Sequence, residues 1–245
     1  MRRRGTRGRR SRNGLPLAFA HPLNTSPVRR PLRQLVSLTL LLAACHNGSS
    51  SEEAPSPAEP ALRPLGQLAA QRVIVTPAFS LVTTDALGWN AQIPKSREYL
   101  RVLDDEIASV LAERGLKSQW IYPADLVRAM KGSPTYAVDP YTLGVGVLRG
   151  SGVVSGTRLG DPLATQLRTM IALQDDARAV IVPVELRFEK EKSGQGSAVL
   201  RVALLDGRLG DVRWIGSVRS DPADKLSRAV LASLSAHLAD LITAP

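Results

Sequence analysis

This 245-residue chain contains few histidines and cysteines that could take part in catalysis or bind a metal. The sequence contains three histidines and one cysteine, Cys45, and of the histidines only His46 and His237 follow that cysteine. A Ser-His-Asp triad needs an imidazole held between a hydroxyl and a carboxylate, and a histidine-based zinc site needs several imidazoles. His46 lies in a Ser/Pro-rich stretch, and His237 lies one position off an apolar helical stripe. We therefore expect no catalytic residue, no metal site and no cofactor.

Two acidic runs are the other source of acid-base chemistry: residues 104–106 (Asp-Asp-Glu) and residues 175–176 (Asp-Asp). Neighbouring side chains on a helix point about 100° apart, so these carboxylates do not converge. We interpret both runs as solvated faces. A hydrolase with unfamiliar carboxylate chemistry remains a third hypothesis, which two carboxyl groups facing each other about 5–9 Å apart would support.

A glycine-rich stretch, Gly-Val-Gly-Val-Leu-Arg-Gly, begins with Gly144 and Gly146. Its spacing is neither G-x-G-x-x-G nor a P-loop, and glycine clusters more often serve backbone bends. We therefore expect residues 132–160 to form a flexible insertion. The second functional hypothesis uses this stretch: a small-ligand or cell-wall-fragment binding module whose contacts are the two glycines, Trp89 and Tyr136. A concave apolar pocket beside Trp89 would favour it, and a flat patch would favour a protein partner.

The elements that must position these residues follow from hydrophobic periodicity and turn residues. Strands are predicted at 72–77, 116–122, 179–188, 198–205 and 212–219. Helices are predicted at 96–114, 123–130, 163–171 and 222–241, the last capped by Asp221. This order predicts one α/β domain, an α+β sandwich over residues 67–245, with a mixed sheet, a C-terminal antiparallel three-stranded meander and helices packed on the sheet.

Charged side chains alternate along the predicted meander. Arg187, Arg201 and Arg213 lie at outward positions together with Glu185. Opposite charges across neighbouring strands are typical of a solvated sheet face rather than of an anion site.

The net charge of the chain is concentrated at its beginning. Lys and Arg number 32 against 22 Asp and Glu, but ten of the arginines and none of the acidic residues precede Cys45. The remainder is therefore close to neutral. A surface that binds nucleic acid depends on the release of counterions by excess cations, so we expect no nucleic-acid partner.

Residues 28–45 have the pattern of an export signal. A basic segment, VRRPLRQ, precedes ten apolar residues, LVSLTLLLAA, and then Cys45. Ten residues are too few to span a bilayer but suit the apolar region of a signal peptide. Leu42, Ala43 and Ala44 with the cysteine resemble the lipobox of bacterial lipoproteins. In that family the cysteine thiol receives diacylglycerol before the peptide is cut in front of it.

The resemblance implies a domain organisation before residue 67. Residues 28–44 would be the signal peptide, and Cys45 would carry acyl chains such as palmitate. Residues 45–66, rich in Ser, Pro and Glu, would form a flexible tether. Two acyl chains contribute on the order of 20 kcal/mol to membrane binding, which is enough for stable anchoring. We expect residues 1–27 to be a misplaced start or a disordered extension.

The folded part also resembles a known family. The matching pieces are RVIVTPAF, ERGLKSQWIYPADLVRAM, ARAVIVPVELRF and LLDGRLGDVRWIGSVRSDP. They are similar to the α/β domain of bacterial envelope lipoproteins of the curli-secretion and penicillin-binding-protein-activator type, which is related in shape to the N-terminal domain of the Tol translocation protein. The resemblance implies a domain that binds other envelope proteins or assembles into rings, and it supplies no catalytic residues. The chain lacks the long amphipathic hairpins of a membrane pore.

The leading hypothesis is therefore a non-enzymatic, lipid-anchored accessory protein of the cell envelope. Its expected partners are the membrane, through the lipid at Cys45, and another envelope protein, with a homo-oligomer possible. The residue after the cysteine is His46 and not Asp, which by resemblance to enteric lipoproteins predicts the outer membrane, facing the periplasm.

Overall fold

The computed structural model describes residues 63–135, 137–174 and 177–244. Several predictions fall outside the described residues: the extension 1–27, the signal peptide 28–44 with Leu42, Ala43 and Ala44, the lipidation site Cys45, the tether as far as residue 62, Tyr136 and the acidic pair 175–176. These stay predictions.

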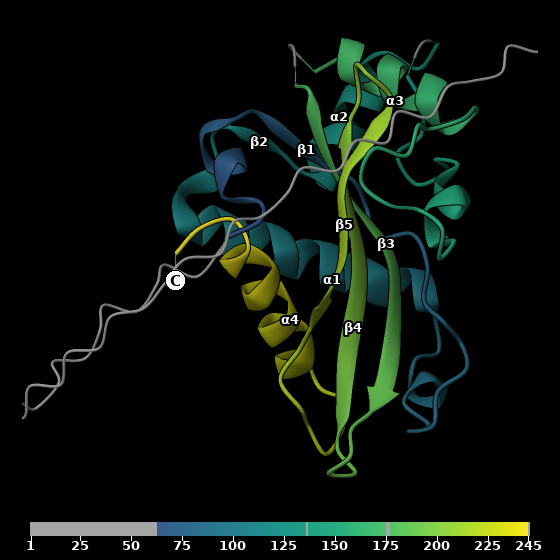
Figure 1. Cartoon of the computed structure of the whole chain (residues 1–245), viewed down its shortest axis with the longest axis vertical. Helices are drawn as coiled ribbons and strands as arrows, with labels where there is room; N and C mark the ends of the chain where they lie inside the picture. The colour runs from purple at the N-terminus through teal and green to yellow at the C-terminus, as the bar shows by residue number, and fades with distance from the viewer. Residues whose placement is uncertain (1–62, 136, 175–176, 245) are drawn as a thin grey trace, which may run out of the picture. The chain divides into compact units, whose positions relative to one another are not determined.

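Five strands and four α-helices make up the described part (Figure 1). The strands are β1 Val73–Val75, β2 Trp120–Ile121, β3 Ala179–Lys190, β4 Gly196–Asp206 and β5 Asp211–Arg219. The α-helices are α1 Ser96–Leu111, α2 Pro123–Gly132, α3 Leu163–Ala172 and α4 Arg228–Asp240. Short helical turns lie at η1 Gly66–Ala70, η2 Asn90–Gln92, η3 Ala112–Leu116 and η4 Val145–Arg149. Among the described residues, no helix has both the length and the apolar character that a membrane crossing requires.

The strands form one mixed sheet in the order β2-β1-β3-β4-β5. β1 runs parallel to both β2 and β3, whereas β3, β4 and β5 pair antiparallel. The predicted α/β class, the mixed sheet and the C-terminal meander are confirmed. β3 joins the parallel and antiparallel halves, and its residues 179–184 are all buried, so helices must cover both of its faces there.

Helices cover both faces of the sheet. α1 and α4 pack on one face, over a core cluster that includes Leu103, Ile107 and Leu234. α3 packs on the other face together with the segment that holds η4, over a second cluster that includes Leu148 and Leu167. Figure 1 shows α1 and α4 together beside the long strands, while α2 and α3 lie toward the opposite end of the sheet.

The segment 132–160, which we expect to be a flexible insertion, contributes to this second core. Leu143, Val145 and Leu148 are each at most 6% exposed, and Leu159 is 7% exposed. Their side chains fill the space over β3 and β4 that α2 and α3 leave uncovered. These buried side chains fix part of the segment, and its flexibility stays a prediction only for the polar turns between them.

A β-bulge in β3 decides which side chains face which helices. The register with β4 shifts between Pro183 and Glu185, where β3 has one extra residue. Strict alternation would place Val184 and Leu186 on the same face, but the bulge changes the phase. Val184 packs in the cluster beneath α3, and Leu186 packs with α1 and α4. After the bulge, the charged residues Glu185, Arg187 and Glu189 therefore lie on the face away from α1 and α4.

Two element boundaries differ most from the prediction. α4 begins at Arg228, after Ser227, and Asp221 is not its cap. The Asp221 N–H donates to Ser233 Oγ, and Ser233 Oγ donates to the Asp221 carboxylate, so Asp221 lies beside the second turn of α4. The strand predicted at 116–122 is reduced to β2, because Gly115, with φ of 85°, ends the helical segment and the turn that follows extends to Gln119.

Candidate functional site

Trp89, a predicted ligand contact, is a core residue. It is 3% exposed and lies edge-to-face with Phe188, with ring centroids 5.4 Å apart. Its ring also lies over Gly196, where an added Cβ would come within 2.6 Å of the indole. The backbone at Trp89 is held by Asp85. Burial alone would raise the pKa of Asp85. Hydrogen bonds from the N–H groups of Asn90 and Trp89 outweigh it and hold the pKa below its usual value.

The two predicted glycine contacts lie elsewhere. Gly144 donates its N–H to Gln166 Oε1 over 2.8 Å, and Gly146 lies in η4, whose Val145 belongs to the cluster beneath α3. Trp89 belongs to the cluster beneath α1 and α4. The structure therefore places the glycines and the tryptophan on opposite sides of the sheet, and these three residues do not share a pocket.

Two cavities flank the turn between β4 and β5. One, of about 440 Å³, is lined by Gln67, Arg178, Asp206 and Arg213 among others, and the second, of about 330 Å³, has Arg168 in its wall. The Asp206 carboxylate is already paired. It accepts hydrogen bonds from Arg213 Nη2 at 3.0 Å and from two backbone N–H groups of the turn. Burial alone would raise the pKa of Asp206, but these hydrogen bonds outweigh it and lower the pKa. The cluster is built to hold the turn.

A further cavity, of about 300 Å³, lies between the start of α1 and the segment that follows β1; we term it the α1 cleft. Its lining residues come from three parts of the chain: Ala78, Phe79, Ser80 and Leu81 after β1, Ser96, Arg97, Leu100 and Arg101 on α1, and Tyr141. The lining thus combines two cations and three hydroxyl groups with apolar side chains, which is a composition that small-ligand sites use.

Asp104 is buried behind the wall of the α1 cleft. We expected a solvated carboxylate here, and that expectation is wrong: Asp104 is 6% exposed. Its Oδ1 accepts the N–H of Ala78 over 2.7 Å, while Oδ2 has no hydrogen-bond partner among the described residues. Burial raises the pKa of Asp104 to about 7, and the neighbouring Asp105 adds to that rise.

Sequence reasoning missed Asp104, although a signal was present. The predicted stripe of α1 runs through Leu100, Leu103, Ile107 and Leu111, and Asp104 is four residues after the first and three before Ile107. A carboxylate at a stripe position is buried with its neighbours. We read the residue as part of an acidic run instead of as an interruption of the apolar face.

Arg101 and Tyr141 close the cleft next to Asp104. The Arg101 guanidinium carbon lies 5.5 Å from the centroid of the Tyr141 ring, within the range of a cation-π contact. Burial raises the pKa of Tyr141, and the charge of Asp104 is the next largest cause of the rise. The carboxylate therefore acts electrostatically on a residue that lines the cleft.

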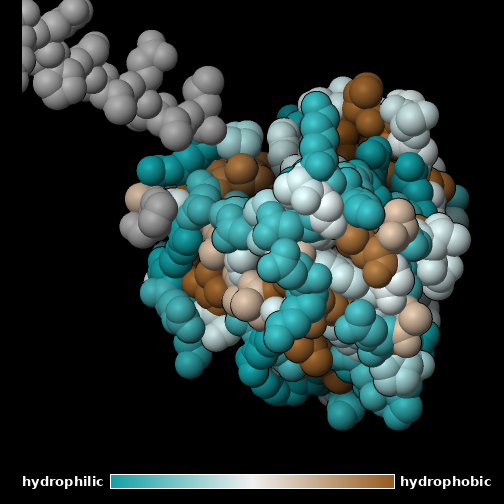
Figure 2. All heavy atoms as spheres, turned by 90° about the horizontal axis from the view of Figure 1, so that it is seen from below, coloured by the Kyte–Doolittle hydropathy of each residue, from teal (hydrophilic) through white to brown (hydrophobic). Residues whose placement is uncertain are grey.

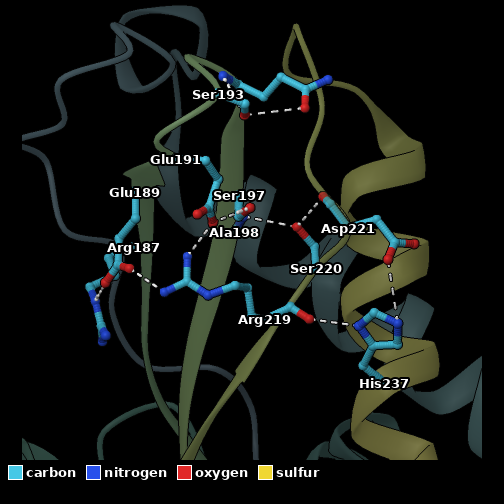
Figure 3. Close-up of polar contacts among 11 residues, drawn as sticks. Arg187, Glu189, Glu191, Ser193, Ser197, Ala198, Arg219, Ser220, Asp221 and His237 are labelled. Atoms are coloured by element: carbon cyan, nitrogen blue, oxygen red, sulfur yellow. Dashed lines mark hydrogen bonds and ion pairs between the residues drawn. The ribbon is translucent and has the colours of Figure 1, made fainter.

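Charged side chains form a continuous network on the outward residues of the meander (Figure 3). Arg219 lies between Glu189 and Glu191, and Arg187 pairs with Glu189 over 2.6 Å. Burial of Glu189 opposes the effect of these arginines, which nevertheless hold its pKa below the usual value. Of the predicted solvated face, only Arg187 belongs to this network. Arg201 donates to backbone carbonyl oxygens of the η4 segment, and Arg213 binds Asp206. Each exposed ion pair contributes about 0–1 kcal/mol to stability.

His237 lies near Asp221 and Ser233, but the three side chains are not arranged as a catalytic triad. His237 Nδ1 is 2.7 Å from the Arg219 carbonyl oxygen, and Nε2 is 3.6 Å from Asp221 Oδ1 (Figure 3). Ser233 Oγ donates to Asp221 Oδ2 and not to the imidazole. A triad needs the imidazole between the hydroxyl and the carboxylate, so His237 ties the end of β5 to α4.

Comparison with known proteins finds only distant likeness. No protein-family model and no curated protein matches the chain. Among solved structures it is similar to the PelC dodecamer from Paraburkholderia phytofirmans, at 16% identity and a TM-score of 0.36 over 76% of this chain and 94% of that chain. It is similar to LpoB from E. coli, at 13% identity and a TM-score of 0.32 over 86% of this chain and 96% of that chain.

A third similar structure is the lipoprotein GNA1162 from Neisseria meningitidis, at 14% identity and a TM-score of 0.33 over 69% of this chain and 96% of that chain. All three TM-scores are below 0.5, so the function has to be argued from the residues of this chain.

Proposed function

We propose that this chain is a lipid-anchored accessory protein of the bacterial cell envelope that binds another envelope component and catalyses no reaction. The observation that carries the proposal is the sequence of residues 28–45, in which a basic segment and ten apolar residues lead to Leu42-Ala43-Ala44-Cys45. Acylation of the Cys45 thiol attaches the protein to the bilayer, and the following Ser/Pro/Glu-rich tether holds the α/β domain away from it.

The surface of the domain offers a contact area for a protein partner. Arg201 donates to the carbonyl oxygens of Leu148 and Gly150, at 3.0 Å each, and fixes the η4 segment on β4. Val147 and Val154 of this segment are 50% and 58% exposed. Exposed aliphatic side chains beside an ion-paired sheet face have the mixed composition of transient protein interfaces.

On the face seen from the end of the β3–β4 hairpin, the apolar side chains are dispersed. Seen from the end of the β3–β4 hairpin, Figure 2 shows apolar side chains separated by hydrophilic ones instead of one continuous apolar patch. Surfaces of this kind suit partners that bind reversibly, because obligate interfaces are larger and more apolar.

Photo-crosslinking in intact cells tests the proposal. A photoreactive residue in place of Val147 or Val154 is expected to yield one discrete protein adduct from the envelope fraction. The same residue at Lys117, an exposed position after α1, serves as the matched control and gives no such adduct. Replacement of Cys45 by Ser is expected to abolish the adduct, because the protein no longer reaches the membrane. Equal labelling at positions 147 and 117 would contradict a specific partner surface.

The location within the envelope is also part of the proposal. His46 after Cys45 favours the outer membrane, with the domain in the periplasm. Separation of inner and outer membranes by density places the protein in one or the other, and recovery in the inner-membrane fraction would overturn this part alone.

A further inference from the structure

We propose that the outer edge of β5 binds an extended segment of the envelope partner, which adds one strand to the sheet along residues 214–218. This inference rests on the proposed function and deepens it, because it says how the partner is held. β5 is the last strand of the sheet, so among the described residues one of its edges has no neighbouring strand (Figure 1). Such an edge presents N–H and C=O groups that pair with the backbone of another chain.

Two hydrogen bonds at the end of β5 show which of its residues face outward. The Ser220 N–H donates to the carbonyl oxygen of Ala198, which directly follows the start of β4, over 2.9 Å. The carbonyl oxygen of Arg219 instead lies 2.7 Å from Nδ1 of His237 on α4. Residue 220 therefore faces β4, and residue 219 faces away from it.

The same alternation continues back along β5, because the residues of an antiparallel strand face its neighbour in turn. Gly216 and Val218 pair with β4, and Ile215 and Ser217 face outward. The outward N–H and C=O groups of these two residues bind no other group in the part of the chain that the structure describes. They can exchange four hydrogen bonds with one extended segment.

The chain itself covers the edge immediately before this open stretch. Residues 156 and 157 bind both backbone groups of Val212, at 2.7 and 2.9 Å. Ser155 Oγ donates to the carbonyl oxygen of Arg213 over 2.7 Å. This edge therefore already accepts an antiparallel segment of this chain, and residues 214–218 leave room for about five residues of another.

The open stretch lacks the residues that keep strand edges from pairing. Soluble proteins protect exposed edges with charged side chains or proline. Residues 214–218 read Trp-Ile-Gly-Ser-Val and contain neither, although Arg213 and Arg219 flank them directly. An uncharged gap between two arginines is expected where a second chain approaches the backbone.

Trp214 determines which side chain the added strand carries next to it. Trp214 is half-buried on the face of the sheet that α1 and α4 cover, and its indole lies over Gly216, where an added Cβ would collide with the ring. Side chains of neighbouring strands lie about 4.5–5.5 Å apart on one face. The partner segment is therefore extended, free of proline, and carries an aliphatic or aromatic side chain beside the indole.

A second copy of β5 fits this edge less well than a segment of a different protein. Antiparallel pairing about Gly216 would place Arg213 of one copy opposite Arg219 of the other, and like charges directly opposite each other are destabilising. The incoming strand would also meet residues 155–157, which already occupy the edge.

Hydrogen exchange of the mature, full-length protein in detergent tests whether the edge is open, and it needs no partner. The N–H groups of Ile215 and Ser217 are expected to exchange about a hundredfold faster than those of Gly216 and Val218, which are bonded to β4. Equal protection of the four N–H groups would show that the chain covers its own edge and would overturn the inference.

Proline at position 217 tests whether the partner uses the edge. Ser217→Pro removes an N–H that points away from β4, and proline is tolerated at such edge positions. With the photoreactive residue in place of Val154, next to Ser155, Ser217→Pro is expected to reduce the adduct in intact cells about fivefold or more. Lys192→Pro, in the turn between β3 and β4, is the matched control and gives the adduct of the parent.

The outcomes separate this inference from the proposed function. An adduct that survives Ser217→Pro would overturn strand addition and leave the partner surface at Val154 standing, and an adduct of two copies of this chain would overturn it in favour of self-association. Absence of any adduct from the parent would contradict the proposed function and strand addition together. If Ser217→Pro does not fold, a photoreactive residue at Ser217 replaces it: strand addition requires an adduct with the partner segment captured from Val154, and none from position 217 would overturn it.

Discussion

Asp104 shows how much one buried carboxylate constrains a domain. It is nearly fully buried, and only one of its oxygens is hydrogen-bonded by the described part of the protein. Transfer of such a charge from water is costly, and the protein reduces the cost by retaining the proton to a higher pH. The residue therefore couples folding stability to pH in the direction opposite to most surface carboxylates.

We expect Asp104 to lower stability as the pH rises. Burial raises its folded-state pKa from the usual 3.8 to about 7, so the folded state binds more protons than the unfolded state between these values. The free energy of unfolding therefore falls through this interval and levels off above it. The free energy of unfolding of Asp104→Asn should exceed that of the parent least below pH 4. The difference should increase to about 4 kcal/mol at most above pH 7.

Urea unfolding of both proteins across this pH range measures the difference. Carboxylates with lowered pKa values, such as Asp85 and Asp206, stabilise the fold less as the pH falls. This effect is the same in both proteins and cancels in the comparison. A difference between the two proteins that is independent of pH would show that Asp104 is not protonated in the folded state near neutral pH.

Glycines that look alike in the sequence have opposite roles within their elements. Gly196 begins β4 beneath Trp89, and a Cβ there would come within 2.5 Å of Leu87 and 2.6 Å of the indole ring. Gly146 lies in η4 with no atom within 4 Å of an added Cβ. The first glycine is required by close packing, whereas the second, which we selected as a ligand contact, has room for a side chain.

We expect Gly196→Ala to destabilise the domain by about 1–3 kcal/mol, because the new methyl group displaces a core tryptophan. Gly146→Ala, the matched control, should change stability by less than about 0.5 kcal/mol or raise it slightly. The midpoints of urea unfolding, followed by tryptophan fluorescence, give both values. Equal midpoints for the two variants would mean that Trp89 is not packed over Gly196.

The elements that the sequence predicts well are those with a long, uninterrupted period. α1, α3 and the meander strands have clear periods. α1 ends four residues before Gly115, α3 begins after Asp161-Pro162, and the strands end at polar turns. The β3 bulge could not be predicted, because the buried run before Pro183 is apolar on both faces and contains no phase to break. The start of α4 was misassigned because Asp221 and Pro222 have the residue types of a helix start, while the tertiary bonds of Asp221 use it otherwise.

For the candidate site, the sequence contained less information. Arg101 and Tyr141 are far apart along the chain and meet only because the segment after α2 returns to α1. Trp89 is a ligand contact in the second hypothesis, but its burial against Phe188 results from long-range pairing that periodicity does not report. Only the position of Asp104 within the α1 stripe could have been read in advance.

For the whole molecule, the compartment in which the domain acts depends on the chemistry of one thiol, that of Cys45. In the proposed function, acylation of Cys45 and cleavage in front of it remove the arginine-rich segment, leave a nearly neutral chain and attach the α/β domain to a membrane. The proposed partner binding at Val147 and Val154 would then take place in the envelope. An unmodified Cys45 would leave the domain with the same fold but in another compartment.

Mass spectrometry of the protein purified from the membrane fraction tests this most directly. We predict that the chain begins at Cys45 and that its N-terminal peptide carries the mass of a diacylglyceryl group, with a further acyl chain where the amine is modified. A peptide that contains residues before Cys45 with an unmodified thiol, recovered from the soluble fraction, would contradict the account.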